Sequence, residues 1–532
     1  MRSVATRMRR GVLQTLRRFH PDREVVEAEF DAGFYLAAHP DVARAGVDPI
    51  EHFLVSGWRE GRDPNRQFSV REYLDANPDV AAAGLNPFVH YLRTGRAEGR
   101  KARHDLGFRY RIIAGLQTLD ERMAQAARLA AAAPASPAGE LTRALAASRT
   151  GLADVHVTFS HDDFTTNVGG VQLCLRREAA AVAAAGRDHL HLYPATPWPA
   201  LRRGEPARLG VLWNGAPAGL HSAETVAAAL RGRIGGGGFA LHSLLGHAVD
   251  ETLAILAAAG LGAGFFWLHD FASLCAGFHL LRDEVEDCAA PPPDSAACNL
   301  CVYGPWRSRH MAEHRRLFEA LELTVVSPSE VTLALWRDRA GLPARGEVVL
   351  PHARLVGRGP ARVPAGQPPL RVGFLGVPAA HKGWPVFREL ALRHAEDPRY
   401  EFHQFSGAPA SGLPVTFHAV SASGPEAEGM RRALEAAEID VALIWPLCRE
   451  TFSFTAYEAV ASGAAVLTHP DSGNVAAFVA AGDHGPVLPD EGALAATFES
   501  GEVLGLARAV RRPSLYDLEY SRLTMDLIGA RP

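Results

Sequence analysis

Short runs of β-branched and aromatic residues alternate with stretches of helical pattern over residues 151–505. In the first half of this region the β runs are 155–159, 189–193, 265–268 and 323–327. In the second half they are 371–376, 400–405, 441–445 and 465–468. This alternation predicts parallel strands joined by crossover helices. We therefore expect an α/β fold of two doubly wound, Rossmann-like units facing a cleft, with ligand bound at the carboxyl ends of the strands.

Changes in composition divide the chain of 532 residues further. Residues 131–139 are rich in Ala and Pro, and residues 357–369 are rich in Pro and Gly, as linkers often are. The predicted order is a basic N-terminal segment (1–29), a two-copy helical repeat module (30–102), a helical linker (103–150), an N-terminal acceptor-side unit (151–340), an interdomain linker (341–369), a C-terminal donor unit (370–505) and a C-terminal helix that packs back on the first half (506–532).

A repeat with an offset of 38 residues precedes the two units. The segment that begins at Phe30 returns at Phe68, so that Gly57 matches Gly95. Each copy predicts two short helices, and the copies should pack together because neither could bury its apolar face alone. The repeat resembles a tandem motif found beside glycosyltransferase domains in bacterial surface-polysaccharide proteins. It contains no nucleophile–base pair, which favours a spacer or a module that contacts a protein partner over a catalytic unit.

The first twenty residues carry six arginines and no acid, with apolar residues at nearly every fourth position. This pattern predicts a helix that is either solvated or lies on an anionic membrane surface. No apolar core of a signal peptide follows the arginines, so we expect a cytoplasmic protein, with peripheral contact at the inner membrane face left open. The net charge of −4 argues against a nucleic-acid partner.

The stretch 441–474 combines an apolar strand, a short loop and a helix that begins near Ser453. Glu450 lies in the loop, and Glu458 lies eight positions later in the helix. The unpaired N–H groups and the positive dipole end of a helix start suit a diphosphate. Ser453 and Thr455 add hydroxyls there, either as caps or as phosphate donors. Glu458 can accept both hydroxyls of a ribose, and Glu450 can reach a sugar beyond the phosphate.

The Glu450-x7-Glu458 pattern, followed by Ala459, Gly463 and Val466, resembles the signature of family 4 retaining glycosyltransferases, which have the GT-B fold. The resemblance implies that Glu450 contacts the transferred sugar in a catalytic role and that Glu458 holds the nucleotide ribose. It also implies hexosyl transfer from a nucleotide sugar to a glycan or lipid-linked acceptor, with retention of configuration, in cell-surface polysaccharide biosynthesis.

The donor unit opens with a strand and a loop that ends in Lys382-Gly383. In the family that the chain resembles, an Arg after the first strand and a Lys before a later glycine bind the donor phosphates. Lys382 matches the lysine, but Val377 stands where the Arg is expected. Either one phosphate cation is missing or it comes from elsewhere, with Arg354 and Arg449 as the candidates.

In the first unit, Gly169-Gly170 follows strand 155–159 and precedes a helix. Paired glycines let backbone N–H groups approach an anion, and the resemblance implies that this loop lies near the donor phosphate. Strand 265–268 ends in His269-Asp270. The resemblance implies that His269 faces the cleft in a catalytic role, hydrogen-bonded to the donor sugar, whereas a purely structural role is the expectation for Asp270.

The sequence contains no Asp-x-Asp triplet, the usual motif for a metal-bound nucleotide sugar. We therefore expect a metal-independent transferase in which Lys382 and helix N-termini stabilise the leaving diphosphate, and no required cofactor. The remaining metal hypothesis concerns four cysteines within 27 residues, Cys275, Cys288, Cys298 and Cys301. Their spacing leaves open a structural four-thiolate zinc site and free thiols.

Two alternatives to a transferase remain. A GT-B sugar-nucleotide epimerase would need acid and base side chains around the sugar, and no such set is recognisable. A non-catalytic glycan-binding or scaffold protein with a degenerate transferase unit is favoured by Val377 and opposed by Glu450, Glu458 and Lys382.

Overall fold

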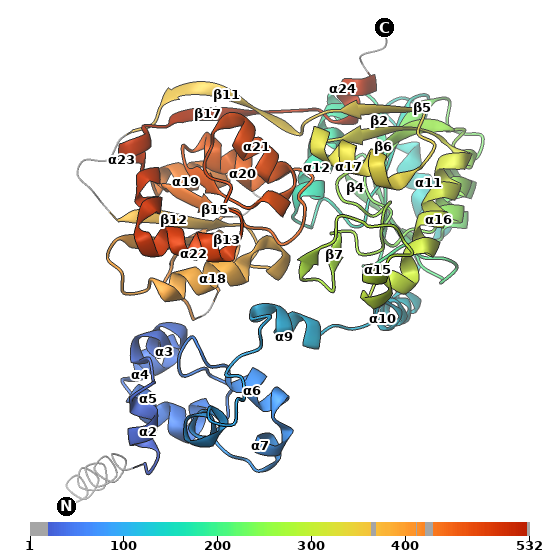
Figure 1. The fold of residues 1–532 in the computed structure, drawn as a ribbon. Coiled ribbons are helices and arrows are strands. Elements are labelled where there is room, and N and C mark those ends of the chain that lie inside the picture. Colours follow the sequence, from blue (N-terminus) through green and yellow to red (C-terminus); the bar gives the residue numbers. More distant parts are fainter. Residues whose placement is uncertain (1–19, 363–368, 411, 421–428, 529–532) are drawn as a thin grey trace, which may run out of the picture.

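The computed structural model describes residues 20–362, 369–410, 412–420 and 429–528 of the chain. Figure 1 shows two α/β units side by side and a separate helical module that lies against the C-terminal unit. The predicted α/β class, with two Rossmann-like units preceded by an all-α module, is confirmed. The predicted basic helix in residues 1–19 falls outside the described residues. Within the described ranges, no helix is both long and apolar enough to cross a membrane.

The first unit is built on an eight-stranded sheet, parallel except for an antiparallel hairpin at one edge. In spatial order its strands are β10 (Gly346–Val349), β9 (Glu322–Ser327), β6 (Ala263–Trp267), β5 (Gly237–Leu241), β1 (Val155–Phe159), β2 (Asp188–Pro194), β3 (Leu209–Trp213) and β4 (Ala216–His221). Its helices are α12 (Gly170–Ala184), α13 (Ala223–Leu230), α14 (Val249–Ala258), α15 (Ala296–Leu300), α16 (Gly304–Ala320) and α17 (Glu330–Ala340). A small hairpin, β7 (Leu281–Arg282) and β8 (Glu286–Asp287), projects from this unit.

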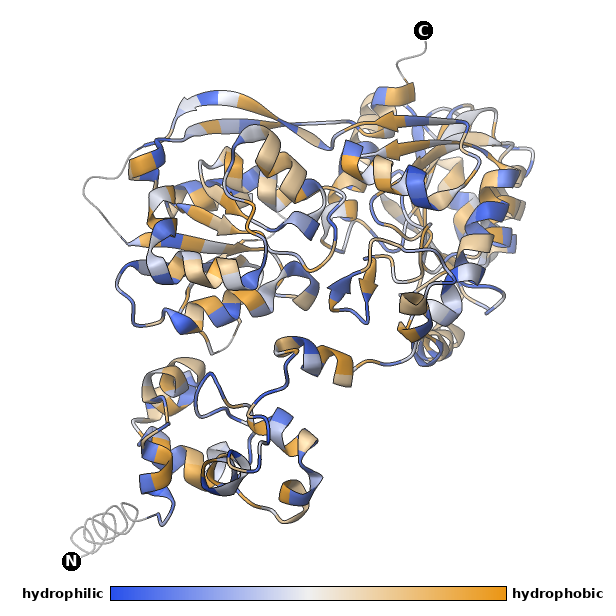
Figure 2. Ribbon diagram, viewed as in Figure 1, coloured by the Kyte–Doolittle hydropathy of each residue, from blue (hydrophilic) through white to orange (hydrophobic). Residues whose placement is uncertain are grey.

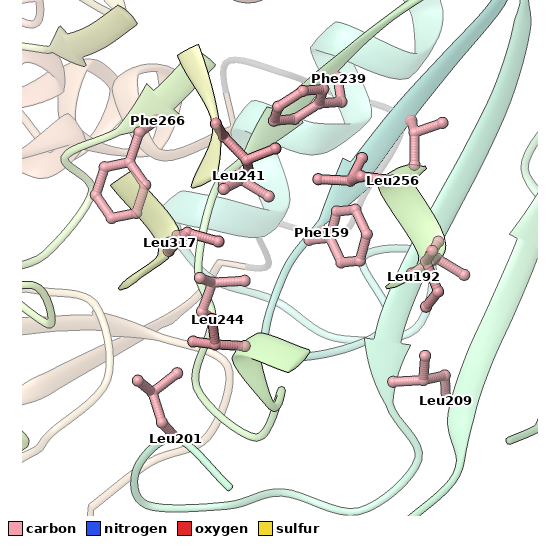
Figure 3. Packing of buried hydrophobic residues seen from close by; sticks show 14 of the residues in the cluster. Phe159, Leu192, Leu201, Leu209, Phe239, Leu241, Leu244, Leu256, Phe266 and Leu317 are labelled. Atoms are coloured by element: carbon pink, nitrogen blue, oxygen red, sulfur yellow. The ribbon is translucent and has the colours of Figure 1, made fainter. Parts of the chain in front are cut away.

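The core of the first unit lies where the central strands meet the helices. Every residue of β1 is buried, as expected for a parallel strand that is covered on both faces. Figure 3 shows Phe159 of β1, Phe239 of β5 and Phe266 of β6 among the leucines that fill the space beside the sheet. This packing fixes the strand ends from which the loops of the candidate site emerge.

The second unit has a five-stranded, fully parallel sheet. Its strands, in spatial order, are β14 (Thr416–Ala419), β13 (Tyr400–Ser406), β12 (Leu370–Leu375), β15 (Val441–Leu443) and β16 (Ala465–Leu467). Its helices are α18 (Trp384–Arg393), α19 (Gly429–Ala436), α20 (Phe454–Ala461), α21 (Asn474–Gly482), α22 (Glu491–Ser500) and α23 (Arg508–Arg511), with 3₁₀ turns at Ala380–Lys382, Pro470–Ser472 and Glu502–Leu506. Figure 2 shows the strands of both sheets as predominantly hydrophobic ribbons.

The chain crosses between the units twice. The stretch 341–369, which the sequence suggests is a linker, contributes β10 to the first sheet and then forms β11 (Ala353–Pro360). β11 pairs antiparallel with β17 (Ser514–Tyr520), and this ribbon runs along the top of the C-terminal unit toward the first unit in Figure 1. After β17, helix α24 (Thr524–Ile528) returns to the first unit, where Trp267 Nε1 donates a hydrogen bond of 2.9 Å to Thr524 Oγ1.

Three helices join the repeat module to the first unit: α9 (Phe108–Ala114), α10 (Leu119–Ala131) and α11 (Ala138–Ala146). The Ala/Pro-rich break lies between α10 and α11, as the composition indicates. Leu119 and Met123 of α10 and Leu141 and Leu145 of α11 are buried in the core of the first unit. These two helices are therefore packed on that unit rather than extended as a spacer.

The repeat module begins with α2 (Arg23–Glu27), and each copy then forms three short helices instead of the two that the pattern predicts. The helices are α3 (Ala32–Ala38), α4 (Pro40–Ala45) and α5 (Pro49–His52) in the first copy, and α6 (Val70–Ala76), α7 (Pro78–Ala82) and α8 (Pro87–His90) in the second. Proline begins the second and third helices of each copy because its fixed φ suits the first helical turn and it breaks what precedes it. α5 and α8 each continue into one π-helical turn, Phe53–Gly57 and Tyr91–Gly95.

The repeated glycines make room for a repeated tyrosine. Tyr35 Oη lies 2.8 Å from His52 Nδ1, and a Cβ on Gly57 would lie 2.1 Å from the Tyr35 hydroxyl. The second copy repeats the arrangement with Tyr73 and Gly95, also at 2.1 Å. Only glycine at this position lets the buried tyrosine reach its histidine.

We predict that Gly57→Ala destabilises the module by about 1–3 kcal/mol, the usual cost of overpacking a tight contact. Thermal unfolding followed by circular dichroism measures the effect. Gly407→Ala is the matched control, because a Cβ there would meet nothing within 4 Å. Equal stability of the two variants would contradict the proposed fit between Gly57 and Tyr35.

Candidate functional site

The loop that follows β15 carries the first of the predicted carboxylates. After β15 the chain runs through 444–453 and enters α20 at Phe454. Glu450 is in the loop and Glu458 is in α20, as predicted. Ser453 is the N-cap residue, and its hydroxyl accepts a bond from the Ala456 N–H and lies 3.1 Å from Thr455 Oγ1. The capping role predicted for Ser453 is therefore present in the structure.

Lys382 and Glu450 form a direct ion pair, with 2.6 Å between Lys382 Nζ and Glu450 Oε1. The lysine side chain keeps 43% of its exposure, whereas the glutamate side chain keeps 13%. Partial burial lowers the pKa of Lys382, but the Glu450 carboxylate outweighs this effect and the net pKa is raised. The two groups therefore orient each other and keep the ammonium charged.

Three loops meet at the Lys382–Glu450 pair: the turn that ends in Lys382-Gly383, the loop 444–453 and the turn at Gly473. We call this region the corner, and two glycines allow its loops to approach closely. Gly383 has φ +80°, and a Cβ on it would lie 1.9 Å from the Trp445 carbonyl oxygen. Gly473 has φ +66°, and its Cβ would lie 2.7 Å from the Glu450 carbonyl oxygen. Both positions thus need glycine for the backbone conformation as well as for the close approach. They place Lys382 and Glu450 side by side.

The carboxyl group of Glu458 has a strongly raised pKa. Burial raises the pKa of its carboxyl group to about 8, and the charges of Arg177 and Arg431 offset this effect only in part. Within the described residues, no hydrogen bond reaches the Glu458 carboxylate. A carboxyl group without a donor, on the helix that Ser453 caps, is able to accept hydroxyl groups of a ligand.

The first unit holds the Glu450 loop from the other side. Arg449 donates two hydrogen bonds to Asp287 of β8, at 2.9 Å from Nε and 2.8 Å from Nη2. Thr451 Oγ1 donates to the His269 carbonyl oxygen at 2.8 Å, and Ser329 Oγ donates to the Thr451 carbonyl oxygen at 3.0 Å. The residues on both sides of Glu450 are therefore attached to the first unit.

The glycine pair Gly169-Gly170 faces this loop. Gly170 is the first residue of α12, which has no side-chain cap, and a Cβ on it would lie 3.7 Å from the Phe454 ring. The N-termini of α12 and α20 therefore come together where the units meet. The first N–H groups of both helices favour an anion there.

His269 lies beside the same contact. Its Nε2 is 2.9 Å from His242 Nδ1, and His242 Nε2 is 3.2 Å from the buried carboxylate of Glu178. Burial holds the pKa of His269 well below its usual range, with the neighbouring His352 and His242 adding to the effect. His269 is thus a neutral imidazole with one nitrogen engaged inside the unit. Asp270 accepts a bond from the Ala272 N–H at 2.8 Å, and burial raises its pKa to about 6.

One set of side chains within the described residues offers three metal-ligand atoms within 4.8 Å of one another, namely Cys174, His269 and His352. Burial raises the pKa of the Cys174 thiol, and nearby Glu178 raises it further, so the thiolate that a metal requires is disfavoured.

The four cysteines of the zinc hypothesis do not fit a zinc centre. They line one small pocket beside α15 and α16, yet no three of their sulfur atoms lie within 4.8 Å of one another in the described part of the chain. Tetrahedral zinc–thiolate bonds of about 2.3 Å need closer sulfurs. Cys298 Sγ instead accepts a hydrogen bond from Arg307 at 2.8 Å, and burial raises the pKa of Cys275 to about 12.

The missing phosphate arginine is not supplied by either sequence candidate in this structure. Val377 is 71% exposed at the expected position. Arg449 is bound to Asp287, and Arg354 is exposed on the β11–β17 ribbon. Arg177 of α12 is a nearer cation for Glu458, and its guanidinium lies 3.3 Å from the centre of the Tyr520 ring.

Two features of the sequence could have indicated further residues of this site. Arg177 lies two turns after Gly170 on a helix that is otherwise mostly apolar. Lysine occurs at only two positions of the chain, Lys101 and Lys382, while arginine supplies the other cationic side chains. In a chain that otherwise uses arginine, a lysine at position 382 indicates that this position requires a compact ammonium group.

No protein-family model and no curated protein sequence matches the chain. Among solved structures, HepE of Anabaena in complex with UDP-glucose is 13% identical, with a TM-score of 0.42, over 70% of this chain and 97% of HepE. WaaG, a glycosyltransferase involved in lipopolysaccharide biosynthesis, is 14% identical, with a TM-score of 0.36, over 67% of this chain and 94% of WaaG. TarM of S. aureus is 9% identical, with a TM-score of 0.36, over 60% of each chain. At these values the similarities do not define a family.

The pKa of Glu458 leads to a stability prediction with a definite sign. A folded-state pKa of about 8, above the ordinary 4.5, stabilises the protein below about pH 4.5, and this contribution is lost as the pH rises through 8. We expect Glu458→Gln to match the wild type near pH 5 and to unfold about 2–4 °C higher at pH 9, the shift that about 1 kcal/mol produces.

Differential scanning fluorimetry across this pH range measures the effect. Glu224→Gln, at an exposed position on α13, is the control for the substitution itself. A Glu458→Gln variant that is less stable than the wild type at pH 9 would show that the carboxylate is stabilised in the folded protein, contrary to this account.

Proposed function

We propose that the chain is a glycosyltransferase that uses a nucleotide-sugar donor and binds it at the contact between the two units. The observation that carries this proposal is the Lys382–Glu450 ion pair, 2.6 Å long, which joins the turn before α18 to the loop before α20. The carboxyl group of Glu458 on α20 has no hydrogen bond within the described residues. A cation, a helix N-terminus and two carboxyl groups form a set that suits a diphosphate flanked by two sugars.

Each group has one role in the proposal. Lys382 and the N-terminus of α20, with Thr455 in its first turn, bind the diphosphate, and Glu458 accepts the ribose hydroxyls. Glu450 binds hydroxyls of the transferred sugar. The Gly169-Gly170 turn adds backbone N–H groups from the first unit, and His269 offers its remaining nitrogen to the sugar. The Lys382–Glu450 bond of the free protein then opens or is shared with the donor.

The proposed reaction needs no metal ion and no cofactor. The bond between the sugar and the diphosphate breaks while the acceptor hydroxyl oxygen attacks the same face of the sugar, so the configuration is retained. The acceptor proton passes to the departing phosphate oxygen. Lys382 and the helix N-termini stabilise the negative charge that develops on the leaving group.

The setting and the acceptor belong to the same proposal. The tandem repeat resembles modules of surface-polysaccharide proteins, which favours a growing glycan or a lipid-linked acceptor handled in the cytoplasm. An acceptor at the membrane would bring the basic first residues of the chain close to anionic lipids.

The two lysines allow a direct test by chemical footprinting. We expect UDP-sugars or other nucleotide sugars that bind to protect Lys382 from acetylation by at least about tenfold at saturation, because its ammonium would be covered by the diphosphate. Lys101, whose exposed side chain pairs with Asp105, is the internal control and should react equally with and without the donor. Mass spectrometry of the two peptides gives both rates.

A second set of variants assigns the roles. Lys382→Ala should abolish binding of the donor, and Glu458→Ala should weaken the binding of nucleotide sugars and of free nucleotides alike. Lys101→Ala should leave the binding of both kinds of ligand unchanged. A donor that binds with unchanged affinity to Glu458→Ala would exclude the ribose role. Protection of both lysines, or of neither, by every nucleotide sugar tested would overturn the proposed site.

A binding protein without turnover is the second candidate function, and it is favoured by the exposed Val377 in place of a phosphate arginine. The two candidates share the donor site and differ in chemistry. A protein that protects Lys382 but releases no nucleotide from any bound donor, with or without oligosaccharide acceptors, would be the binding protein.

A further inference from the structure

A second pocket lies between the repeat module and the C-terminal unit, and one of its walls is α18, the helix that follows Lys382-Gly383. Its volume is about 400 Å³, within the range of small-molecule sites. The module contributes α3 and the turn 60–66, and the C-terminal unit contributes α18. Figure 1 shows α3 facing this part of the C-terminal unit.

Arginines dominate the walls of this pocket, which we call the arginine pocket. Those from the module side are Arg62, Arg66, Arg71, Arg103 and Arg111. Those from α18 are Arg388 and Arg393. The acids that line it are Glu60, Asp63 and Glu389, so positive charge exceeds negative charge.

The lining arginines divide into paired and unpaired groups. Arg62 is paired with Asp41 and Glu60, Arg103 and Arg111 share Asp63, and Arg393 is paired with Glu499. Within the described residues, Arg66, Arg71 and Arg388 form no ion pair.

Two arginines of the pocket also have a side-chain donor without a partner. Arg66 donates one hydrogen bond to the Leu392 carbonyl oxygen, yet its Nε is buried without a partner, as is Nε of Arg103. Burial lowers the pKa of Arg66, and burial together with the charge of Arg111 lowers the pKa of Arg388. Guanidinium donors that are buried without a partner, close to other positive charges, are costly.

An apolar contact holds the pocket together. Phe34 and Ala38 of α3 pack on Leu392 of α18, and all three are buried. Arg109 on α9 adds a bidentate pair with Glu491 of α22, at 3.2 and 2.5 Å. The apolar contact forms part of the pocket wall, whereas the Arg109–Glu491 pair lies outside the pocket. The repeat module is therefore docked against the C-terminal unit by contacts that do not use the unpaired arginines.

We propose that the arginine pocket is a second ligand site, which binds a molecule or chain segment that carries at least two phosphate or carboxylate groups. Guanidinium forks recognise both groups by paired hydrogen bonds, and a bound anion would satisfy the unused donors and cancel the repulsion. The ligand touches both the repeat module and α18, so it links the module to the C-terminal unit. Its two chemical sources are a diphosphate and an acidic saccharide.

Isothermal titration calorimetry with pyrophosphate and with a galacturonic acid trisaccharide tests the proposal and separates the two sources. The titrations use the full chain with Lys382→Ala, so that the proposed donor site does not contribute. We expect at least one of the two probes to bind, with an affinity that falls as salt rises, and the neutral maltotriose not to bind. Failure of the proposed donor site in the lysine experiment leaves this result unaffected.

Arg388→Gln in the same background should weaken binding by at least about tenfold, because one charge-assisted contact is lost. Arg44→Gln, on the exposed face of α4 and outside the pocket, is the matched control and should bind like its parent. Absence of binding by both acidic probes, or equal binding by Arg388→Gln and Arg44→Gln, would overturn the proposal.

Thermal unfolding checks that the Arg388→Gln variant is folded. Since Arg388→Gln removes one of several like charges, its melting temperature without ligand should equal or exceed that of its parent at low salt. A clear loss of stability would show that groups of the protein already neutralise the positive charge of Arg388. It would overturn the proposal that this pocket binds an anion.

Discussion

The attachment of one loop to the opposite unit is the constraint on which the candidate site depends. The loop after β15 belongs to the C-terminal unit, yet Arg449 is bound to Asp287 and Thr451 to the backbone of His269 in the first unit. Glu450 lies between these two anchors and meets Lys382 from the other side. The positions of Lys382, Glu450 and His269 are therefore set jointly by both units, and any motion of one unit against the other would move the site.

Electrostatics then makes this corner receptive to an anion flanked by hydroxyl groups. The N-terminus of α12, which has no side-chain cap, meets the N-terminus of α20, which Ser453 caps. The charged Lys382 pairs with Glu450 in the loop before α20. Burial raises the pKa of Glu458 to about 8, and no residue in the described part of the chain donates a hydrogen bond to its carboxyl group. Hydroxyl donors of a ligand would stabilise this buried carboxyl group, because they would supply hydrogen bonds that it lacks in the protein.

The sequence was sufficient for the repetitive and periodic parts of the chain and insufficient for what depends on tertiary contact. The buried strands β1, β9 and β13, and the placement of Glu450 and Glu458 before and within a helix, follow from local apolar patterns. The pairing of β11 with β17, about 160 residues apart in sequence, carries no local signal. The same holds for the Arg449–Asp287 pair and for the nearness of Arg177 to Glu458. The cysteine spacing left zinc and free thiols open for a related reason, since spacing alone does not say whether four sulfurs come together.

A structure of the chain with a bound nucleotide sugar tests the central claim most directly. We predict that the diphosphate contacts Lys382 and the N-terminus of α20, that the ribose hydroxyls bond to the carboxyl group of Glu458, and that Glu450 reaches the sugar. The loop between Arg449 and Thr451 should keep both anchors on the first unit. A nucleotide bound elsewhere, or at this corner with its ribose away from Glu458, would contradict the account.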